Sequence, residues 1–288
     1  MPLLSSTLSL TCFLWLTFTL SSLTIASPVT LLIPSQPNVE IPKKSDTQEN
    51  NSPNIPEEID ILISMMKPFQ HEGLSMDMPQ LFAVLHYDKN TPEKDGYLIG
   101  ERKDLLGDIE QIMYLNQKAW GANVALPKPG LYQFIIESRP WWDEENKRFI
   151  QHLVKTVLPV YGVERGWDQF AGQVFEILPL TRPFGLSSPN MFTGQALLQG
   201  VPIKNTIVTM NRINIEDITA PTPWHEEMIA KTDNDGKFSF IVNAPGWWCC
   251  TAKIAGDPLK GPDGNPAPRE LGASFWFYVD AMPIQPEK

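Results

Sequence analysis

The sequence predicts a mainly β protein with two antiparallel, β-sandwich-like domains, of which the C-terminal one is immunoglobulin- or transthyretin-like. The 288 residues include 27 prolines and 18 glycines, which favours short elements separated by turns over long helices. Short apolar stretches of alternating polarity recur along the chain, as they do in strands. Hydrophobic residues make up 42% and charged residues 19%, a balance that supports a packed core.

The N-terminal segment, residues 1–26, is expected to be a signal peptide. It contains no Lys, Arg, Asp or Glu, and its apolar part ends at Ala26 with residues small enough for cleavage before Ser27. The basic residues that usually open a signal peptide are missing. An uncleaved N-terminal membrane anchor is the alternative, because about 19 such residues span a bilayer. Either segment predicts a periplasmic or otherwise exported protein.

An N-terminal β domain is predicted over residues 27–180, with a polar loop at 36–58 that is rich in Pro, Asn, Ser, Lys and Glu. The strand after this loop places alternate apolar residues, Ile59 and Ile61 among them, on one face. A helix is predicted at 104–115, where the helical signal is best. The other strands of this domain are predicted at 29–33, 81–87, 131–136, 149–158 and 173–178.

A domain boundary is predicted at residues 181–185, followed by a C-terminal β-sandwich over 186–281. About seven strands in about 95 residues suit a small antiparallel sandwich. The acidic turn at 233–236 is expected to close a hairpin, because Gly236 can take a positive φ. A calcium loop is excluded there, since Lys231 and Val242 occupy positions that need acidic ligands. The strands of this domain are predicted at 192–198, 206–213, 228–231, 238–242, 247–254 and 272–279.

Charge and motifs exclude several functions. A net charge of −10 disfavours binding to nucleic acid. No Gly-x-Ser-x-Gly elbow or phosphate-binding glycine loop occurs in the sequence. His225 and Glu226 begin like a zinc-protease helix, but Ile229 stands where the second histidine is required. We therefore predict that the protein is not an enzyme.

The candidate metal ligands are His152, His71, Met76 and Met78. Imidazole is the commonest side-chain ligand for nickel, cobalt, copper and zinc, and thioethers bind copper(I). His71 lies in a methionine-rich segment with Met76 and Met78. Methionine equally fills irregular gaps in a core. His152 shares a predicted strand face with apolar residues, so a core histidine is the alternative for that position, as it is for His86.

Two adjacent cysteines, Cys249 and Cys250, follow Trp247 and Trp248. Neighbouring side chains on a strand point to opposite faces, so we expect one buried thiol and one that is partly exposed. An intermolecular disulfide or a thiolate site for a soft metal is the alternative.

Several strings resemble those of one known family. The sequence is similar to bacterial periplasmic proteins that are assigned to nickel/cobalt transport systems and that formally make up a family of unknown function. The resemblance covers about residues 29–280. The strings are "LLIPS", "KPFQHEG", "FIQHLVKT", "EILPLTRPFGL", "KTDNDGKFSF" and "APGWW", of which "EILPLTRPFGL" and the "GWW" turn are the specific ones.

This resemblance implies a periplasmic protein that helps deliver Ni²⁺ or Co²⁺ to a membrane transporter. The family pattern has three histidines, of which this chain keeps His152. Pro28 and Lys67 replace the other two, and Cys249 with Cys250 replaces the usual Gly-Phe after "GWW". The resemblance therefore supports the fold better than the metal site.

Two functional hypotheses follow. The first is an accessory protein for nickel or cobalt uptake that binds or hands over a divalent ion through His152 with His71 or a nearby methionine or carboxylate. The alternative is a non-catalytic β-sandwich binding or structural module of the cell envelope that has lost metal binding. Such a module would contact a protein or glycan through aromatic pairs such as 141–142 or 247–248, because aromatic side chains are common interface anchors.

Overall fold

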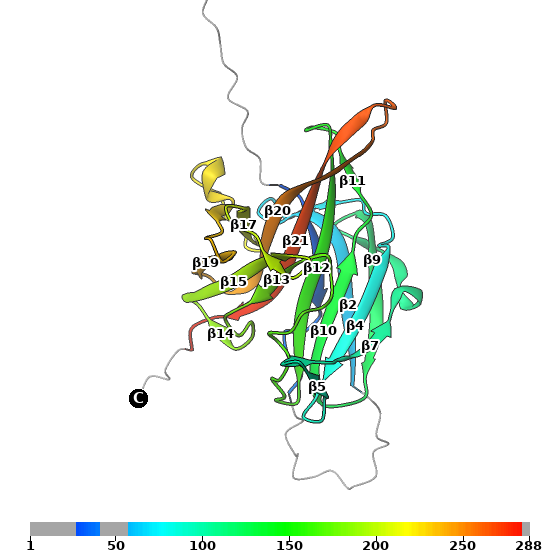
Figure 1. Cartoon of the computed structure of the whole chain (residues 1–288). Coiled ribbons are helices and arrows are strands. Elements are labelled where there is room, and N and C mark those ends of the chain that lie inside the picture. Colours follow the sequence, from blue (N-terminus) through cyan, green and yellow to red (C-terminus); the bar gives the residue numbers. More distant parts are fainter. Residues whose placement is uncertain (1–26, 41–56, 284–288) are drawn as a thin grey trace, which may run out of the picture.

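The computed structural model describes residues 27–40 and 57–283, which are almost entirely β strand (Figure 1). This confirms the predicted fold class. The helices in these ranges are two short 3₁₀ turns, η1 (Leu106–Asp108) and η2 (Pro223–His225). Neither is long or apolar enough to cross a membrane. The predicted signal segment at 1–26 and most of the predicted polar loop lie outside the described residues.

A large sheet forms the middle layer of the molecule, in the order β18-β17-β20-β21-β12-β10-β4-β7. The short strands β11 (Trp141–Asp143) and β14 (Leu186–Ser187) pair with β12 and β21. The main strands are β18 (Met228–Lys231), β17 (Ile207–Arg212), β20 (Gly246–Lys260), β21 (Pro266–Asp280), β12 (Arg148–Val160), β10 (Gly130–Glu137), β4 (Leu81–Tyr87) and β7 (Glu101–Asp104).

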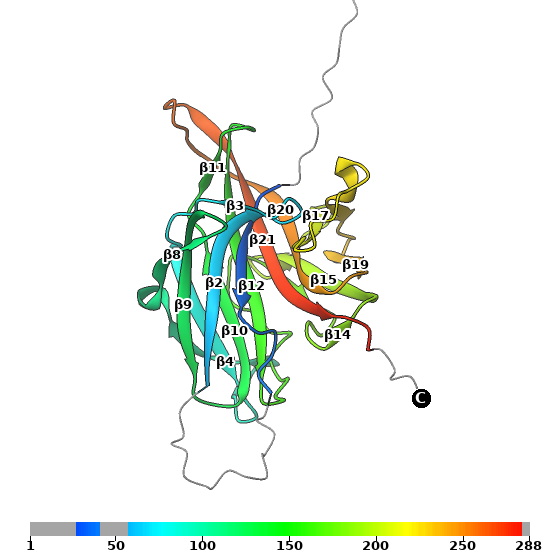
Figure 2. The same ribbon diagram turned by 180° about the vertical axis from the view of Figure 1, so that it is seen from behind.

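Two smaller sheets pack on opposite faces of the large sheet. The front sheet has the order β1-β2-β9-β8, with β3 paired to β2, and it lies toward the viewer in Figure 2. The small sheet joins β13, β15, β16 and β19, and β5 (Glu93–Lys94) with β6 (Tyr97–Leu98) forms a separate ribbon. The strands of the two sheets are β1 (Val29–Pro34), β2 (Glu57–Lys67), β9 (Gln117–Leu126), β8 (Glu110–Tyr114), β3 (Glu72–Leu74), β13 (Phe175–Pro179), β15 (Asn190–Leu198), β16 (Val201–Pro202) and β19 (Lys237–Val242).

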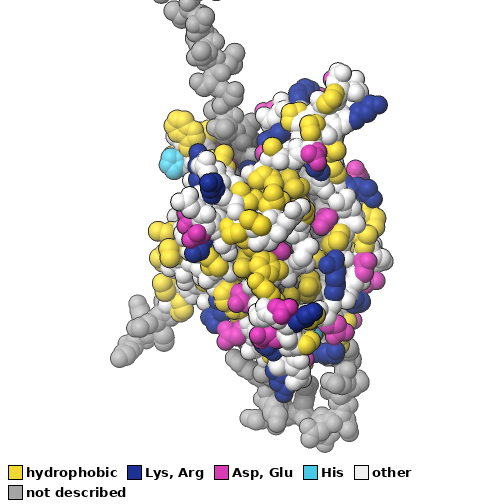
Figure 3. Space-filling model, in the orientation of Figure 1, with side chains coloured by type: hydrophobic (Ala, Val, Ile, Leu, Met, Phe, Trp, Pro, Cys, Tyr) yellow, Lys and Arg dark blue, Asp and Glu magenta, His cyan; other side chains and the backbone are white. Residues whose placement is uncertain are grey.

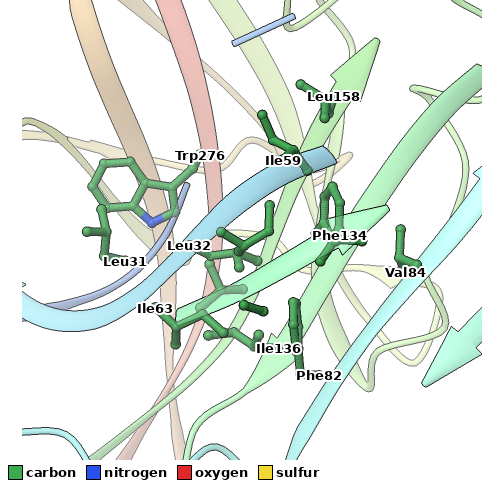
Figure 4. Close-up of a cluster of buried hydrophobic side chains, with 14 of the residues drawn as sticks. Leu31, Leu32, Ile59, Ile63, Phe82, Val84, Phe134, Ile136, Leu158 and Trp276 are labelled. Atoms are coloured by element: carbon green, nitrogen blue, oxygen red, sulfur yellow. The ribbon is translucent and has the colours of Figure 1, made fainter. Parts of the chain in front are cut away.

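Two apolar cores lie on either side of the large sheet. The first fills the space to the front sheet, where Leu31 and Ile63 meet Phe134 and Trp276 (Figure 4). The second fills the space to the small sheet, where the rings of Phe192 and Phe277 stack with centroids 4.2 Å apart. Successive side chains of β12, β20 and β21 pack alternately in the first and the second core, because neighbouring side chains of a strand point to opposite faces.

The central joint of the molecule is the parallel pairing of β12 with β21, which runs from Phe149 opposite Arg269 to Thr156 opposite Trp276. Strands from the two predicted domains therefore share one sheet. Strand β13, which precedes the predicted boundary, likewise pairs with β15, which follows it. The division at 180–186 stays a prediction.

Most strands lie where the sequence predicts them, and three local expectations are wrong. Residues 104–115 form η1 and the edge strand β8 instead of a helix, because pairing with β9 overrides a weak helical signal. The turn at 233–236 has Gly236 at φ 73°, but it connects strands of two different sheets and closes no hairpin. Cys249 and Cys250 are both fully buried, because the two faces of β20 meet two different cores.

Candidate functional site

A split in the large sheet creates the main candidate site. Beyond Thr156 and Trp276 the paired strands diverge: β12 continues to Val160 beside β10, and β21 continues to Asp280 beside β20. Figure 2 shows β21, in red, bending away from β12. Because the two strands are parallel, the opening lies at the carboxyl ends of both.

Two chain segments cover the edges that this divergence leaves unpaired. Val39 donates its N–H to the Pro159 carbonyl at 3.0 Å and accepts from the Tyr161 N–H at 2.8 Å. On the other side Leu186 of β14 pairs with Val279 of β21. These contacts cover backbone groups of Pro159, Tyr161, Val279 and Asp280, and a space stays open between the two strands.

We name this space the fork cleft; its volume is about 520 Å³. Trp247 and Tyr278 form one wall, with ring centroids 5.4 Å apart at an interplanar angle of 68°. In the same lining the Arg182 guanidinium lies 5.3 Å from the Phe184 ring centroid. The lining residues are Pro37, Asn38, Val39, Glu40, Val157, Pro159, Gly162, Val163, Glu164, Arg182, Pro183, Phe184, Gly185, Trp247, Tyr278 and Asp280.

A second cavity adjoins the fork cleft at Trp247, which lines both. We name it the sheet groove; it has a volume of about 790 Å³ and lies across the four main strands of the front sheet. Asp60, Leu62 and Asn123 come from strand positions that alternate with those of the buried core. The lining residues are Ile33, Pro34, Ser35, Asp60, Ile61, Leu62, Asp108, Glu110, Ile112, Gly121, Ala122, Asn123 and Trp247.

The linings of these cavities offer apolar and carboxylate groups to a ligand. Among the described residues no histidine or cysteine lines either cavity, and Ser35 shares the sheet groove with Asp60, Asp108 and Glu110. Aromatic and aliphatic side chains alternate with carboxylates, a combination that buries apolar parts of a ligand and fixes its polar groups.

The predicted metal ligand His152 is a fully buried core residue. The Thr30 backbone N–H donates to its Nδ1 at 3.2 Å, so Nδ1 is the unprotonated nitrogen and Nε2 carries the proton. Nε2 has no hydrogen-bond partner among the described residues. Burial, with the nearby charges of Lys253 and Arg148, lowers the pKa of His152 to about 3. Metal binding at Nε2 would therefore require a change of tautomer and the loss of the Thr30 bond.

The other predicted ligands lie on different parts of the β2–β3–β4 region. His71 occupies the turn between β2 and β3 with φ at 48°. Met76 is buried in the first core, and its carbonyl accepts from Trp120 Nε1 at 3.2 Å, whereas Met78 is 37% exposed. Among the described residues no group of three or more His, Cys, Asp or Glu side chains is placed to hold a metal ion. The four-residue metal site stays a prediction.

Sequence reasoning named Trp247 as a contact residue but missed Phe184, Arg182 and Tyr278. Part of this site could have been found from the sequence. The strings "EILPLTRPFGL" and "GWW", which are the specific ones in the family resemblance, contain Arg182, Phe184 and Trp247, and all three residues line the fork cleft. Trp248, the partner of Trp247 in the predicted pair, is buried in the second core.

No functionally curated protein matches this chain significantly. Among solved structures, the chain is similar to the Yersinia pseudotuberculosis adhesin InvE at 10% identity and a TM-score of 0.19, covering 85% of this chain and 58% of that one. It is also similar to the D00-D0 domain of intimin at 12% identity and a TM-score of 0.19, covering 87% and 99%. The third is the pair of V-type regions of a chitin-binding protein, at 11% identity and a TM-score of 0.22, covering 84% and 99%.

These TM-scores are low, and neither the detailed topology nor the function of those proteins is carried over to this chain. The chain also spans less than two thirds of the InvE structure. A family model gives the assignment that the solved structures do not. The model, described as "Domain of unknown function (DUF4198)", matches residues 45–256, and the chain therefore belongs to the DUF4198 family.

Proposed function

We propose that this protein is a non-catalytic binding module of the cell envelope whose ligand contacts Trp247 in the fork cleft. One observation carries this proposal. The sheet is built around an opening whose two edges are separately capped by Val39 and by β14, and Trp247 stands at the junction of both cavities. Export from the cytoplasm is part of the proposal and rests on the apolar N-terminal sequence.

The role of a binding module, rather than an enzyme, is supported by the residues that line the cavities. Their side chains offer apolar contact and hydrogen bonds, and they include no paired nucleophile and base. The aromatic wall is also held in place, because Trp247 packs against Tyr278 and against the first core. A rigid aromatic surface binds with little loss of conformational entropy.

A ligand screen tests this proposal. The purified protein is screened by thermal shift against oligosaccharides, neutral peptides, basic peptides and divalent metal ions, and hits are confirmed by calorimetry. We expect an organic ligand whose binding is lost in Trp247→Ala but kept in Trp224→Ala, since Trp224 is 81% exposed and lines neither cavity. Recovery of the unchanged ligand after incubation is expected for a binding module.

Two results would contradict the proposal. One is that every organic ligand binds Trp247→Ala as well as the unchanged protein. The other is that the ligand is chemically converted during incubation.

Delivery of Ni²⁺ or Co²⁺ to a membrane transporter is the second candidate function. The feature that would serve it is Nε2 of the buried His152, which has no hydrogen-bond partner among the described residues and would become a ligand after the tautomer change described above. Imidazole nitrogen is a common ligand for these ions. The DUF4198 description assigns no metal, so the rest of the support is the sequence resemblance. Calorimetric titration with Ni²⁺ and Co²⁺ tests it: tight binding that His152→Asn abolishes would support metal delivery, and unchanged affinity would exclude His152.

A further inference from the structure

The fork cleft and the sheet groove adjoin at Trp247, and we infer that together they bind an extended segment of a positively charged polypeptide. This inference rests on the proposed function, because it names the ligand class for the same site. Three features of the two cavities carry it: their extent, their charge and an internal example of the contact.

The extent of the site fits a chain better than a compact ligand. The sheet groove crosses from β1 to β8, which is three strand spacings or about 14 Å. An extended peptide covers this distance with about four residues. The fork cleft continues the surface beyond Trp247. Because the groove runs across the strands, side chains rather than the backbone of the front sheet would recognise the ligand.

The charge of the lining selects a cation. Among the described residues that line the two cavities, Arg182 is the only basic one, and it is paired with Glu164 at 2.8 Å. Lys103, outside the linings, pairs with Asp108 at 3.7 Å, so the carboxylates left for a ligand are chiefly those of Glu40, Asp60, Glu110 and Asp280. Leu62 and Ile112 supply apolar surface between the acids, which suits the aliphatic stems of lysine and arginine. Phosphates, uronic acids and other anions are disfavoured. The acidic side chains in the two linings are Glu40, Asp60, Asp108, Glu110, Glu164 and Asp280.

This charge pattern differs from that of the opposite face of the molecule. There, basic and acidic side chains are interspersed around a central group of apolar ones (Figure 3). The joined cavities therefore concentrate negative potential, which attracts cations and raises their local concentration.

Arg182 gives an internal example of the contact that a cationic ligand would make. Its guanidinium lies over the Phe184 ring and bonds the Glu164 carboxylate. Trp247 and Tyr278 stand in the same lining as Asp280. An aromatic face beside a carboxylate binds lysine and arginine side chains through cation–π attraction and ion pairing.

A labelled ten-residue peptide of alternating lysine and alanine is the probe, and fluorescence anisotropy with the full chain is the measurement. The control peptide replaces every lysine with glutamine. We expect binding of the lysine peptide only, with affinity that falls steeply between low and high salt, because the Debye length shrinks from about 10 Å at 0.1 M to about 3 Å at 1 M. Penta-N-acetylchitopentaose, a neutral oligosaccharide, is expected not to compete.

Charge-neutral variants locate the binding. Asp60→Asn with Glu110→Gln is expected to weaken peptide binding about 25-fold, at about fivefold for each carboxylate, the factor that corresponds to about 1 kcal/mol. The matched control is Glu145→Gln with Asp257→Asn, which removes the same charge from exposed sites outside both linings. Unchanged thermal midpoints establish that all variants fold.

The inference fails if the glutamine peptide binds equally, or if the control pair weakens binding as much as the groove pair. If penta-N-acetylchitopentaose or another neutral ligand binds in a Trp247-dependent manner while the lysine peptide does not, the cationic ligand class is wrong and the proposed function stands. If Trp247→Ala changes no binding at all, both are wrong.

Discussion

Replacing Lys155 with methionine is expected to destabilise the protein by about 3–5 kcal/mol. Lys155 on β12 bonds Glu176 on β13 with Nζ and Oε2 2.8 Å apart, and the side chains are 1% and 5% exposed. The pair links the large sheet to the small sheet. Without the ammonium group, the Glu176 carboxylate would remain buried and charged.

The size of this loss of stability depends on the groups that still bond the Glu176 carboxylate in the variant. The backbone N–H groups of Ala171 and Gly172 donate to its carboxylate at 2.9 and 3.3 Å, so part of the charge stays solvated by the protein. The methionine itself packs well in place of the lysine stem, so the cost is that of the unpaired charge. Removing both charges in Lys155→Met with Glu176→Gln is therefore expected to restore most of the lost stability.

Equilibrium urea unfolding followed by tryptophan fluorescence measures these changes. Lys118→Met is the matched control, because the Lys118–Asp77 pair is 35% and 74% exposed and such pairs contribute less than about 1 kcal/mol. The reasoning is refuted if Lys155→Met unfolds at the same urea concentration as the unchanged protein. It is also refuted if the double variant is as unstable as the single one.

Three further predictions concern the buried residues of the large sheet. The pKa of His152 falls from 6.5 to about 3 on folding, so the free energy of unfolding is expected to drop by about 2 kcal/mol between pH 7 and pH 5, and His152→Asn should reduce this drop in urea unfolding. Gly272→Ala should lower stability by about 1–3 kcal/mol, because its Cβ would lie 2.4 Å from His152 Cδ2, whereas Gly107→Ala meets nothing within 4 Å and should be neutral in thermal melts. Burial raises the pKa of the Cys249 thiol to about 12 and that of Cys250 well above its usual value, so iodoacetamide should label neither residue until urea unfolds the chain. Peptide mass spectra that show labelling of Cys249 or Cys250 in the native protein would contradict this.

Strands with strong alternation were predictable from the sequence. Strand β4 has the bounds 81–87 that its apolar residues indicate, and β2 buries Ile59 and Ile61 on one face as predicted. Strand β9 was missed because its sequence, with Ala119, Gly121 and Ala122, carries little of the bulky alternation that marks a strand. Its identity is fixed by pairing with β2 on one side and β8 on the other.

The candidate site was less predictable, because it depends on where two strands separate. Val39, Arg182 and Tyr278 lie far apart in the sequence and meet only because β12 and β21 diverge after Thr156. Local periodicity carries no information about this divergence. Local periodicity was also insufficient for His152. The alternation of apolar residues indicated that this side chain is buried, but it did not indicate the hydrogen bond from Thr30 on β1.

The parallel pairing of β12 with β21 also sets an order of events during synthesis. A ribosome releases residues 148–156 more than a hundred residues before it releases Pro266–Asp280. Until then one side of the newly made β12 has no permanent neighbour, and an uncovered strand edge recruits other chains. We therefore expect the nascent polypeptide to reach its native state only after Pro266–Asp280 has been released, and to depend on chaperones until that moment.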